Sequence, residues 1–200
     1  MFDWITGFVE TSGYFGIAFL MLAENVFPPI PSEIIMPLAG FTAKQGSLSL
    51  VGVILAGSIG SVAGTTVWYF LGRWIGLERL RSFAARHGRW LTLTPEELDR
   101  TQRFFERHCG KAVLIGRLIP AVRTLISVPA GIVAMGLGRF LLYSTVGTLF
   151  WVSLLAGAGY LLGSQYQAVS GWLNPITNVI IGLAVLWYLY RVITFRPKAA

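Results

Sequence analysis

The strongest constraint on the fold is the length of the uncharged apolar segments. Residues 48–72 form a run of 25 residues without a charged side chain, and residues 140–163 form a second run of 24. Residues 172–190 form a third run of 19, with tryptophan and tyrosine near its ends. A helix needs about 20 apolar residues to cross the hydrocarbon core of a bilayer, and these aromatic residues favour the membrane interface. We therefore expect three transmembrane helices.

The composition excludes the common soluble classes. Hydrophobic residues make up 54% of the 200 residues and charged residues only 12%, whereas soluble domains typically carry about 25% charged residues. The single cysteine, Cys109, excludes an internal disulfide. His108 beside it has no companion ligands in the sequence, so we expect neither a metal nor a cofactor. The prediction is an all-α polytopic membrane protein, with residues 1–200 forming a single membrane domain.

The net charge of +7 is concentrated in two blocks. Residues 73–111 contain nine Lys and Arg against five Asp and Glu, and Arg191, Arg196 and Lys198 add the rest. Basic residues beside membrane spans are typical of cytoplasmic segments, so we expect 73–111 and the C-terminus to be cytoplasmic. The charge distribution does not indicate a nucleic-acid partner. Thr94, Pro95 and Glu97 predict the start of an amphipathic helix on the membrane surface.

Residues 112–137 are apolar but unsuited to a plain helix. They contain Arg117, Pro120, Arg123 and Pro129, and proline interrupts helical hydrogen bonding. If both basic blocks are cytoplasmic, the chain between them must leave the cytoplasm and return to it. The two later spans already make these two crossings, so residues 112–137 must enter and leave the membrane on the same side. Irregular backbone at membrane depth is tolerated where it is buried in protein or lines a wet cavity. We expect a re-entrant loop.

The first half of the chain contains a matching segment, with Glu24, Glu33 and the four prolines Pro28, Pro29, Pro31 and Pro37. A shift of 91 residues without gaps pairs Pro29 with Pro120, Ala39-Gly40 with Ala130-Gly131, and Tyr69 with Tyr160. Each half then has one broken segment followed by one span, and the two spans run in opposite directions. Inverted repeats with discontinuous helices are typical of transporters, although an ancient duplication without transport would leave the same pattern.

The expected organisation is therefore an inverted repeat of two re-entrant broken-helix loops, each followed by a transmembrane helix. Residues 1–72 form the first repeat, 73–111 the cytoplasmic amphipathic linker, and 112–163 the second repeat. Residues 164–200 form a C-terminal transmembrane helix and a basic tail.

Two acids and two arginines lie in the broken segments, with Glu24 and Glu33 on the first and Arg117 and Arg123 on the second. A charge at the bilayer centre costs from about 3 to over 10 kcal/mol unless it is paired or hydrated. We therefore expect the loops to face each other with their opposite charges in contact. In one interpretation, which stays open, these ion pairs only hold the loops together.

In the functional interpretation, Arg117 and Arg123 bind a phosphate through their planar guanidinium groups. Glu24 and Glu33 then act as proton-responsive competitors, since a carboxyl group in a desolvated site exchanges protons near neutrality. The residues expected to shape the loops are Pro28, Pro29, Pro31, Pro120, Pro129 and Gly131.

At these residues the sequence resembles the DedA family, the membrane proteins that share the SNARE-associated or VTT domain. The resemblance rests on PPIPSE from residue 28, PLAG from residue 37, FFERHCGKAVLIGRLIPAVRT from residue 104 and PAG from residue 129. Ser32 departs from the glycine expected in the acidic motif. The resemblance implies a bacterial plasma-membrane flippase for undecaprenyl phosphate, with proton-motive-force dependence in some members. It also implies that Glu24, Glu33, Arg117 and Arg123 are required.

The leading hypothesis is thus a lipid-phosphate flippase whose partners are a polyprenyl phosphate or phospholipid, protons and membrane lipids. The alternatives are a proton-coupled carrier of small solutes or ions and a non-transporting membrane scaffold. An enzyme is the weakest interpretation, because the two histidines, His87 and His108, lack the nucleophile or carboxylate cluster that hydrolysis needs. The oligomeric state stays open, a homo-oligomer included, as does whether residues 1–19 cross the membrane.

Overall fold

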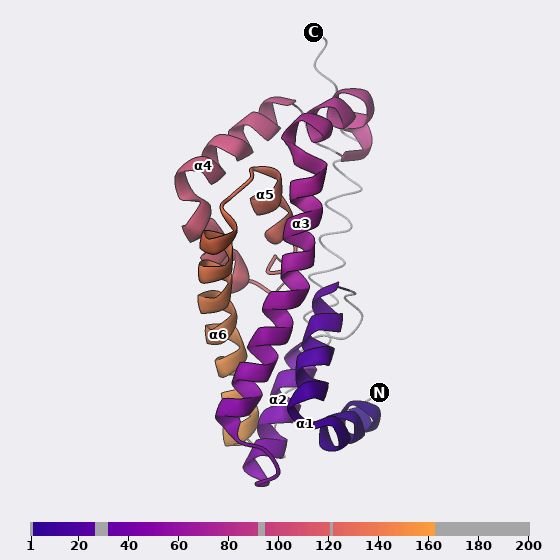
Figure 1. Cartoon of the computed structure of the whole chain (residues 1–200), viewed down its shortest axis with the longest axis vertical. Coiled ribbons are helices and arrows are strands. Elements are labelled where there is room, and N and C mark those ends of the chain that lie inside the picture. Colours follow the sequence, from indigo (N-terminus) through magenta and orange to yellow (C-terminus); the bar gives the residue numbers. More distant parts are fainter. Residues whose placement is uncertain (1, 27–31, 92–94, 121, 163–200) are drawn as a thin grey trace.

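The computed structural model describes residues 2–26, 32–91, 95–120 and 122–162 (Figure 1). This part of the chain is helical and contains no strand, which confirms the all-α prediction for it. The helices are α1 (Phe2–Val26), α2 (Ser32–Lys44), α3 (Leu50–Leu91), α4 (Pro95–Arg117), α5 (Ser127–Ile132) and α6 (Leu137–Leu162). The predicted C-terminal helix at 172–190 and the prolines Pro28, Pro29 and Pro31 lie outside the described residues.

Two helices in the described residues are long and apolar enough to cross a membrane. They are Leu50–Ser82 of α3, with 33 residues, and Leu137–Leu162, with 26. Less than half of the most apolar window of each is buried, at 44% and 39%. The outward faces carry exposed apolar side chains at helical spacing: Val51, Leu55 and Ile59 on α3, and Leu142, Val146, Phe150 and Leu154 on α6. Exposed apolar surfaces of this extent match lipid as the surrounding solvent.

Helix α3 does not end at residue 72, where the apolar run stops. Helical structure continues to Leu91, over 42 residues in all, although Gly76, with a φ of 67°, interrupts the regular geometry. The reason is that residues 73–91 are rich in Arg, Leu and Ala, which favour helix, and contain no proline. The apolar span therefore ends close to a break at Gly76, and helical structure resumes beyond it.

Two helical hairpins enter the fold from opposite ends (Figure 1). Helix α1 bends at Gly13, whose φ of 54° is in the left-handed region, and its second part rises beside α3 before α2 returns. At the other end, α4 bends at His108 (φ −126°, ψ 16°) and descends beside α6. The turn at residues 118–126 then reverses the chain into α5, which packs on α3. The ends of the two hairpins meet inside the helix bundle.

Helix α2 packs closely against α6 through two glycines. A Cβ atom at Gly40 would overlap the carbonyl group of Ala156, and a Cβ atom at Gly159 would overlap the carbonyl group of Pro37. Small residues at such positions let helix backbones approach closely in a membrane. The first hairpin is therefore fixed to the long helix of the second half of the chain.

Helix α5 packs in the same way against α3. A Cβ atom at Gly131 would overlap the carbonyl group of Tyr69, and one at Gly72 would overlap that of Val128. Gly131 thus lies where the two backbones come closest. Gly131 and Val128 correspond to Gly40 and Pro37 under the shift of 91 residues, so each short helix contacts the long helix of the other half.

The contacts also correct the ungapped pairing of the two long helices. Tyr69 and Gly72 of α3 make the same contacts with α5 that Ala156 and Gly159 of α6 make with α2. The ungapped shift pairs Tyr69 with Tyr160, which lies one helical turn further along. The chain from Gly131 of α5 to Ala156 of α6 is one helical turn shorter than the chain from Gly40 of α2 to Tyr69 of α3, and a sequence comparison without gaps could not register this.

Candidate functional site

An ion pair between Arg123 and Glu24 joins the two hairpins. Arg123 lies in the turn at residues 118–126, and Glu24 lies in the last turn of α1. Both residues are almost fully buried, at 7% and 6% exposed. The backbone N–H of Ser32, the first residue of α2, also donates a hydrogen bond to the Glu24 carboxylate. The predicted contact between acid and arginine is therefore present for this pair.

Glu33 provides a second carboxylate beside the same arginine. It lies in the first turn of α2, and its Oε1 atom is 4.0 Å from Nη2 of Arg123. Its side chain is 20% exposed, against 6% for Glu24. One guanidinium group is thus shared by two carboxylates of different depth.

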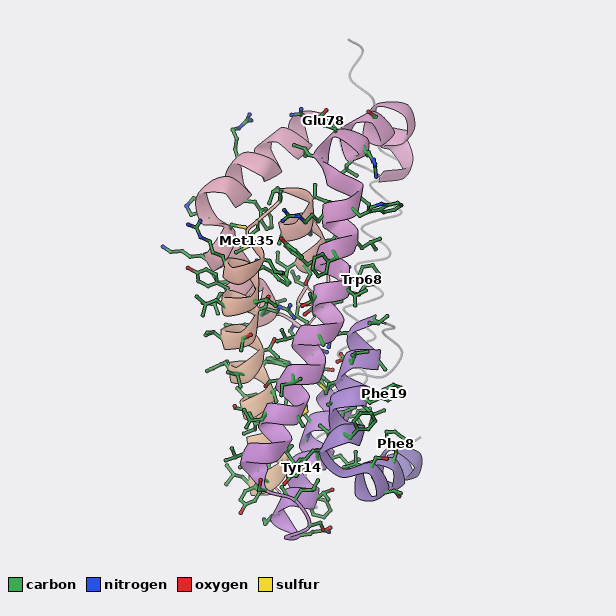
Figure 2. The ribbon with its side chains drawn as sticks, viewed as in Figure 1. Phe8, Tyr14, Phe19, Trp68, Glu78 and Met135 are labelled. Atoms are coloured by element: carbon green, nitrogen blue, oxygen red, sulfur yellow. The ribbon has the colours of Figure 1, made fainter. Side chains whose placement is uncertain are left out.

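Asn25 belongs to the site but was not predicted. Its side-chain amide nitrogen lies 3.2 Å from Oε2 of Glu24 and 3.1 Å from Oγ of Ser61 on α3. Its Oδ1 atom accepts a hydrogen bond from Thr124, at 3.4 Å. Trp68, labelled in Figure 2, donates through Nε1 to the backbone carbonyl of Asn25 at 2.7 Å. The sequence signal that could have identified Asn25 is a polar amide side chain directly after Glu24 in an otherwise apolar stretch.

Arg117 has a different environment from the one predicted. Its Nη2 atom lies 3.4 Å from Oγ of Ser127 and 3.2 Å from Oγ of Ser144. Its guanidinium carbon is 5.9 Å from the centre of the Phe140 ring. Among the described residues no carboxylate is within ion-pair distance of Arg117, so the expectation that both arginines meet acids is wrong for this one.

Arg117 is also deeply buried, with 2% of its surface exposed and its Nε atom without a hydrogen-bond partner. The positive charge of Arg123 acts on it. Serine hydroxyls and an aromatic face stabilise a guanidinium group without neutralising it. Arg117 is therefore a buried cation that no described carboxylate contacts directly.

The local backbone explains how Arg117 and Arg123 come to flank one turn. Helix α4 ends at Arg117, three residues before Pro120, since proline disfavours helix in the residues that precede it. The N–H groups of Val122 and Arg123 both donate to the carbonyl of Ile119, which closes a tight turn. Pro129 lies in the first turn of α5, where its missing N–H costs no helical hydrogen bond.

The arrangement can bind an anion and exchange partners for a buried charge. Two arginines, two carboxylates and one amide surround the ends of the hairpins, beside residues 61–68 of α3. These residues lie near the middle of the apolar span Leu50–Ser82. The described residues contain no group of three His, Cys, Asp or Glu side chains that could hold a metal ion.

Fold and site together define a helical membrane protein with a charged site inside its apolar bundle. Residues 30–161 match the VTT domain, and the chain belongs to this family, the DedA family.

Several curated relatives cover nearly the whole chain. An alkaline phosphatase-like protein of Lactococcus lactis is 38% identical over 187 residues, which are 93% of this chain and 87% of that one. Undecaprenyl phosphate transporter A of Staphylococcus aureus is 35% identical over 197 residues, 97% of each chain. The protein of the same name in Bacillus subtilis is 32% identical over 194 residues, 96% of this chain and 92% of that one. No solved structure matches.

Proposed function

We propose that this protein moves undecaprenyl phosphate across the bacterial inner membrane, with the phosphate head group passing through the charged site. Two relatives that align over more than nine-tenths of this chain carry the name undecaprenyl phosphate transporter A. The observation that carries the proposal is the buried guanidinium group of Arg117, which no described carboxylate contacts. A phosphate monoester supplies the negative charge that this guanidinium group lacks, and arginine suits phosphate oxygens because its donors form a planar fork.

The proposal assigns the two hairpins to opposite leaflets, as re-entrant loops of an inverted repeat. Its support is the reciprocal packing of α2 on α6 and of α5 on α3, which repeats the same pattern of glycine and carbonyl contacts. In this arrangement residues 73–111 and the C-terminus are cytoplasmic, as their basic residues favour. The charged site then lies near the bilayer midplane, where inverted-repeat transporters bind their substrates.

In this mechanism the phosphate and the carboxylates compete for Arg123. In the structure Glu24 and Glu33 hold Arg123. Protonation of a glutamate would weaken its attraction for the guanidinium group and free Arg123 to join Arg117 around a phosphate. Displacement of the phosphate would follow when the glutamate loses its proton. This exchange links substrate release to a proton without a covalent step.

The polyprenyl tail would stay in lipid while the head group moves. The turn that carries Arg123 presents apolar side chains outward, with Ile119 45% and Leu125 63% exposed. A phosphate bound beside Arg123 is therefore a short distance from an apolar surface. That geometry suits a lipid whose head group alone needs a polar path.

The direct test is a sidedness assay in vesicles that contain undecaprenyl phosphate and the purified protein. We expect the wild type to move the lipid between leaflets and a pH gradient to change the rate. Glu24→Gln should respond less to the gradient, and Arg117→Met should move little lipid. Equal rates in empty and protein-containing vesicles would contradict the proposal, as would release of inorganic phosphate from the lipid.

The same vesicles separate this function from its alternatives. Proton flux driven by a small solute, in vesicles without prenyl phosphate, would instead indicate a solute or ion carrier. Loss of cellular function in Glu24→Gln only where folding is also lost would indicate a scaffold.

A further inference from the structure

A polar cavity lies in the half of the molecule away from the N-terminus. Its volume is about 600 Å³, and it is bounded by α4, the turn at residues 133–136 and the first turns of α6. Met135 in this turn is labelled in Figure 2, where α4 passes the start of α6. The polar or reactive side chains that line it are His108, Cys109, Lys111, Arg139 and Tyr143.

Local backbone features form this cavity. Helix α4 departs from helical geometry at His108, and Ala134 adopts a φ of 53°, which turns the chain sharply between α5 and α6. Any side chain at Gly110 would overlap the ring of Tyr143. The glycine therefore lets Tyr143 lie against α4, and these features together hold the two walls in a fixed relation.

The charge of the cavity is positive. Lys111 extends from α4 and Arg139 from α6, both side chains are exposed, and none of the residues that line the cavity is an Asp or Glu. Gly136 and the first turn of α6 add backbone N–H groups that have no partner within the helix, at the positive end of the helix dipole. Two cations on opposite walls with a helix start between them favour a phosphate group.

A short aromatic layer separates this cavity from Arg117. The hydroxyl of Tyr69 donates a hydrogen bond to the carbonyl of Met135, which lines the cavity. The Tyr69 ring stacks on Phe140 with their centres 4.5 Å apart, and Phe140 in turn lies beside the Arg117 guanidinium group. The basic cavity and the buried site thus lie on either side of one pair of rings.

We propose that the cavity formed by α4, the 133–136 turn and α6 is a second binding site for a phosphate monoester group, held by Lys111 and Arg139. A volume of this size holds a small molecule, so it has room for a phosphate and the first carbons of a prenyl chain. The inference extends the proposed function, because it places a docking site for the head group one aromatic layer from Arg117. Its binding test does not depend on transport.

Cys109 provides a local reporter, since it lines the cavity and is the single cysteine of the chain. The experiment measures the rate of Cys109 alkylation by N-ethylmaleimide in detergent-purified full-length protein. Farnesyl phosphate should slow the alkylation at least threefold, whereas farnesol should leave it unchanged. The protection should be lost in the Lys111→Gln/Arg139→Gln double variant. Protection is measured there as the alkylation rate with ligand relative to the rate of the same variant without ligand.

A parallel arm with inorganic phosphate distinguishes a lipid head group from the free anion. Protection by inorganic phosphate at the same concentration as farnesyl phosphate would assign the cavity to free phosphate. Equal protection by farnesol, or full protection in the double variant, would overturn the inference. Absence of protection at farnesyl phosphate concentrations up to its solubility limit would also overturn it.

One further variant, together with the wild type, separates this inference from the proposed function. Arg117→Met should abolish lipid movement and keep the Cys109 protection. If the wild type moves lipid but shows no protection, only the second site fails. If it shows protection but moves no lipid, only the proposed function fails.

Discussion

Arg123 and Glu24 form a buried ion pair across 99 residues of sequence. The pair joins the end of α1 to the turn after α4, so it closes the contact between two hairpins that enter from opposite ends. Arg117, at the other end of that turn, has serine hydroxyls and an aromatic ring instead of an acid. The two arginines therefore have different environments, one paired with carboxylates and one held by hydroxyl groups and a ring.

This difference predicts opposite stability effects for the two arginines. Arg123→Met leaves the buried Glu24 without the guanidinium group that it pairs with and should destabilise the protein by about 3–5 kcal/mol. Arg117→Met removes a cation with no described acid partner, so stability should stay near that of the wild type or rise. The midpoint of SDS-induced unfolding measures both. A larger loss in Arg117→Met than in Arg123→Met would show that Arg117 is mainly structural.

Replacement of Arg123 by lysine tests the planar fork. Lysine keeps the positive charge, so the ion pair with Glu24 should survive and the unfolding midpoint should fall only slightly. Phosphate recognition should suffer more, because an ammonium group lacks the paired donors of guanidinium. We expect correct insertion with little lipid movement in vesicles. Wild-type movement in Arg123→Lys would rule out bidentate phosphate binding by this residue.

The two glutamates should differ in their importance for stability. Glu24 is the deeper acid and also receives the Ser32 N–H and the Asn25 amide, whereas Glu33 is 4.0 Å from Arg123 and partly exposed. Glu24→Gln should therefore lower the unfolding midpoint more than Glu33→Gln, which is its matched control. An equal or reversed order would mean that Arg123 does not depend mainly on Glu24.

A pair of glycines two residues apart on α6 tests the close packing. Gly159→Ala should destabilise by about 1–3 kcal/mol, because the added methyl group would overlap the Pro37 carbonyl. Gly157→Ala meets open space and should be neutral or raise stability by up to about 1 kcal/mol. Unfolding midpoints of the two variants give the comparison. Similar values would mean that α2 does not pack against α6 at Gly159.

The reactivity of Cys109 should depend on Arg139. Burial raises the pKa of the Cys109 thiol, and the positive charge of Arg139 acts in the opposite direction. Arg139→Gln should raise the pKa further and slow alkylation at pH 8, since the thiolate is the reactive form. The difference from wild type should shrink as the pH rises through the thiol pKa of the variant. A pH profile of the alkylation rate measures this, and identical profiles would place Arg139 away from the cysteine.

Much of the fold follows from the sequence because lipid imposes simple rules. The uncharged runs at 48–72 and 140–163 predicted the two long helices, and the position of Pro95 predicted the start of α4. The separation of acids and arginines between two broken segments predicted the contact of Arg123 with Glu24 and Glu33. These signals can be read from a single sequence because a charge buried in the membrane needs a partner of opposite charge from elsewhere in the chain.

The environment of Arg117 could not be predicted in the same way. Ser127 and Ser144 resemble many other serines in apolar segments, and such hydroxyls commonly bond to the carbonyl one turn earlier in their own helix. Thr42 and Thr65 do so here, through Leu38 and Ser61. Which hydroxyl instead turns toward a guanidinium group depends on how α4, α5 and α6 pack, and this information is absent from local sequence.

Each short helix packs on the long helix of the other half, and this affects how the protein can fold during its synthesis. Helix α2 finds its close contact on α6, and α5 finds its own on α3, so neither half can bury its short helix alone. A nascent chain that has reached residue 72 carries Glu24 in an apolar hairpin without a counter-charge. Quality-control proteases that survey the membrane would thus meet an unfinished surface until synthesis passes Arg123, and premature truncation anywhere before α6 should yield a short-lived product.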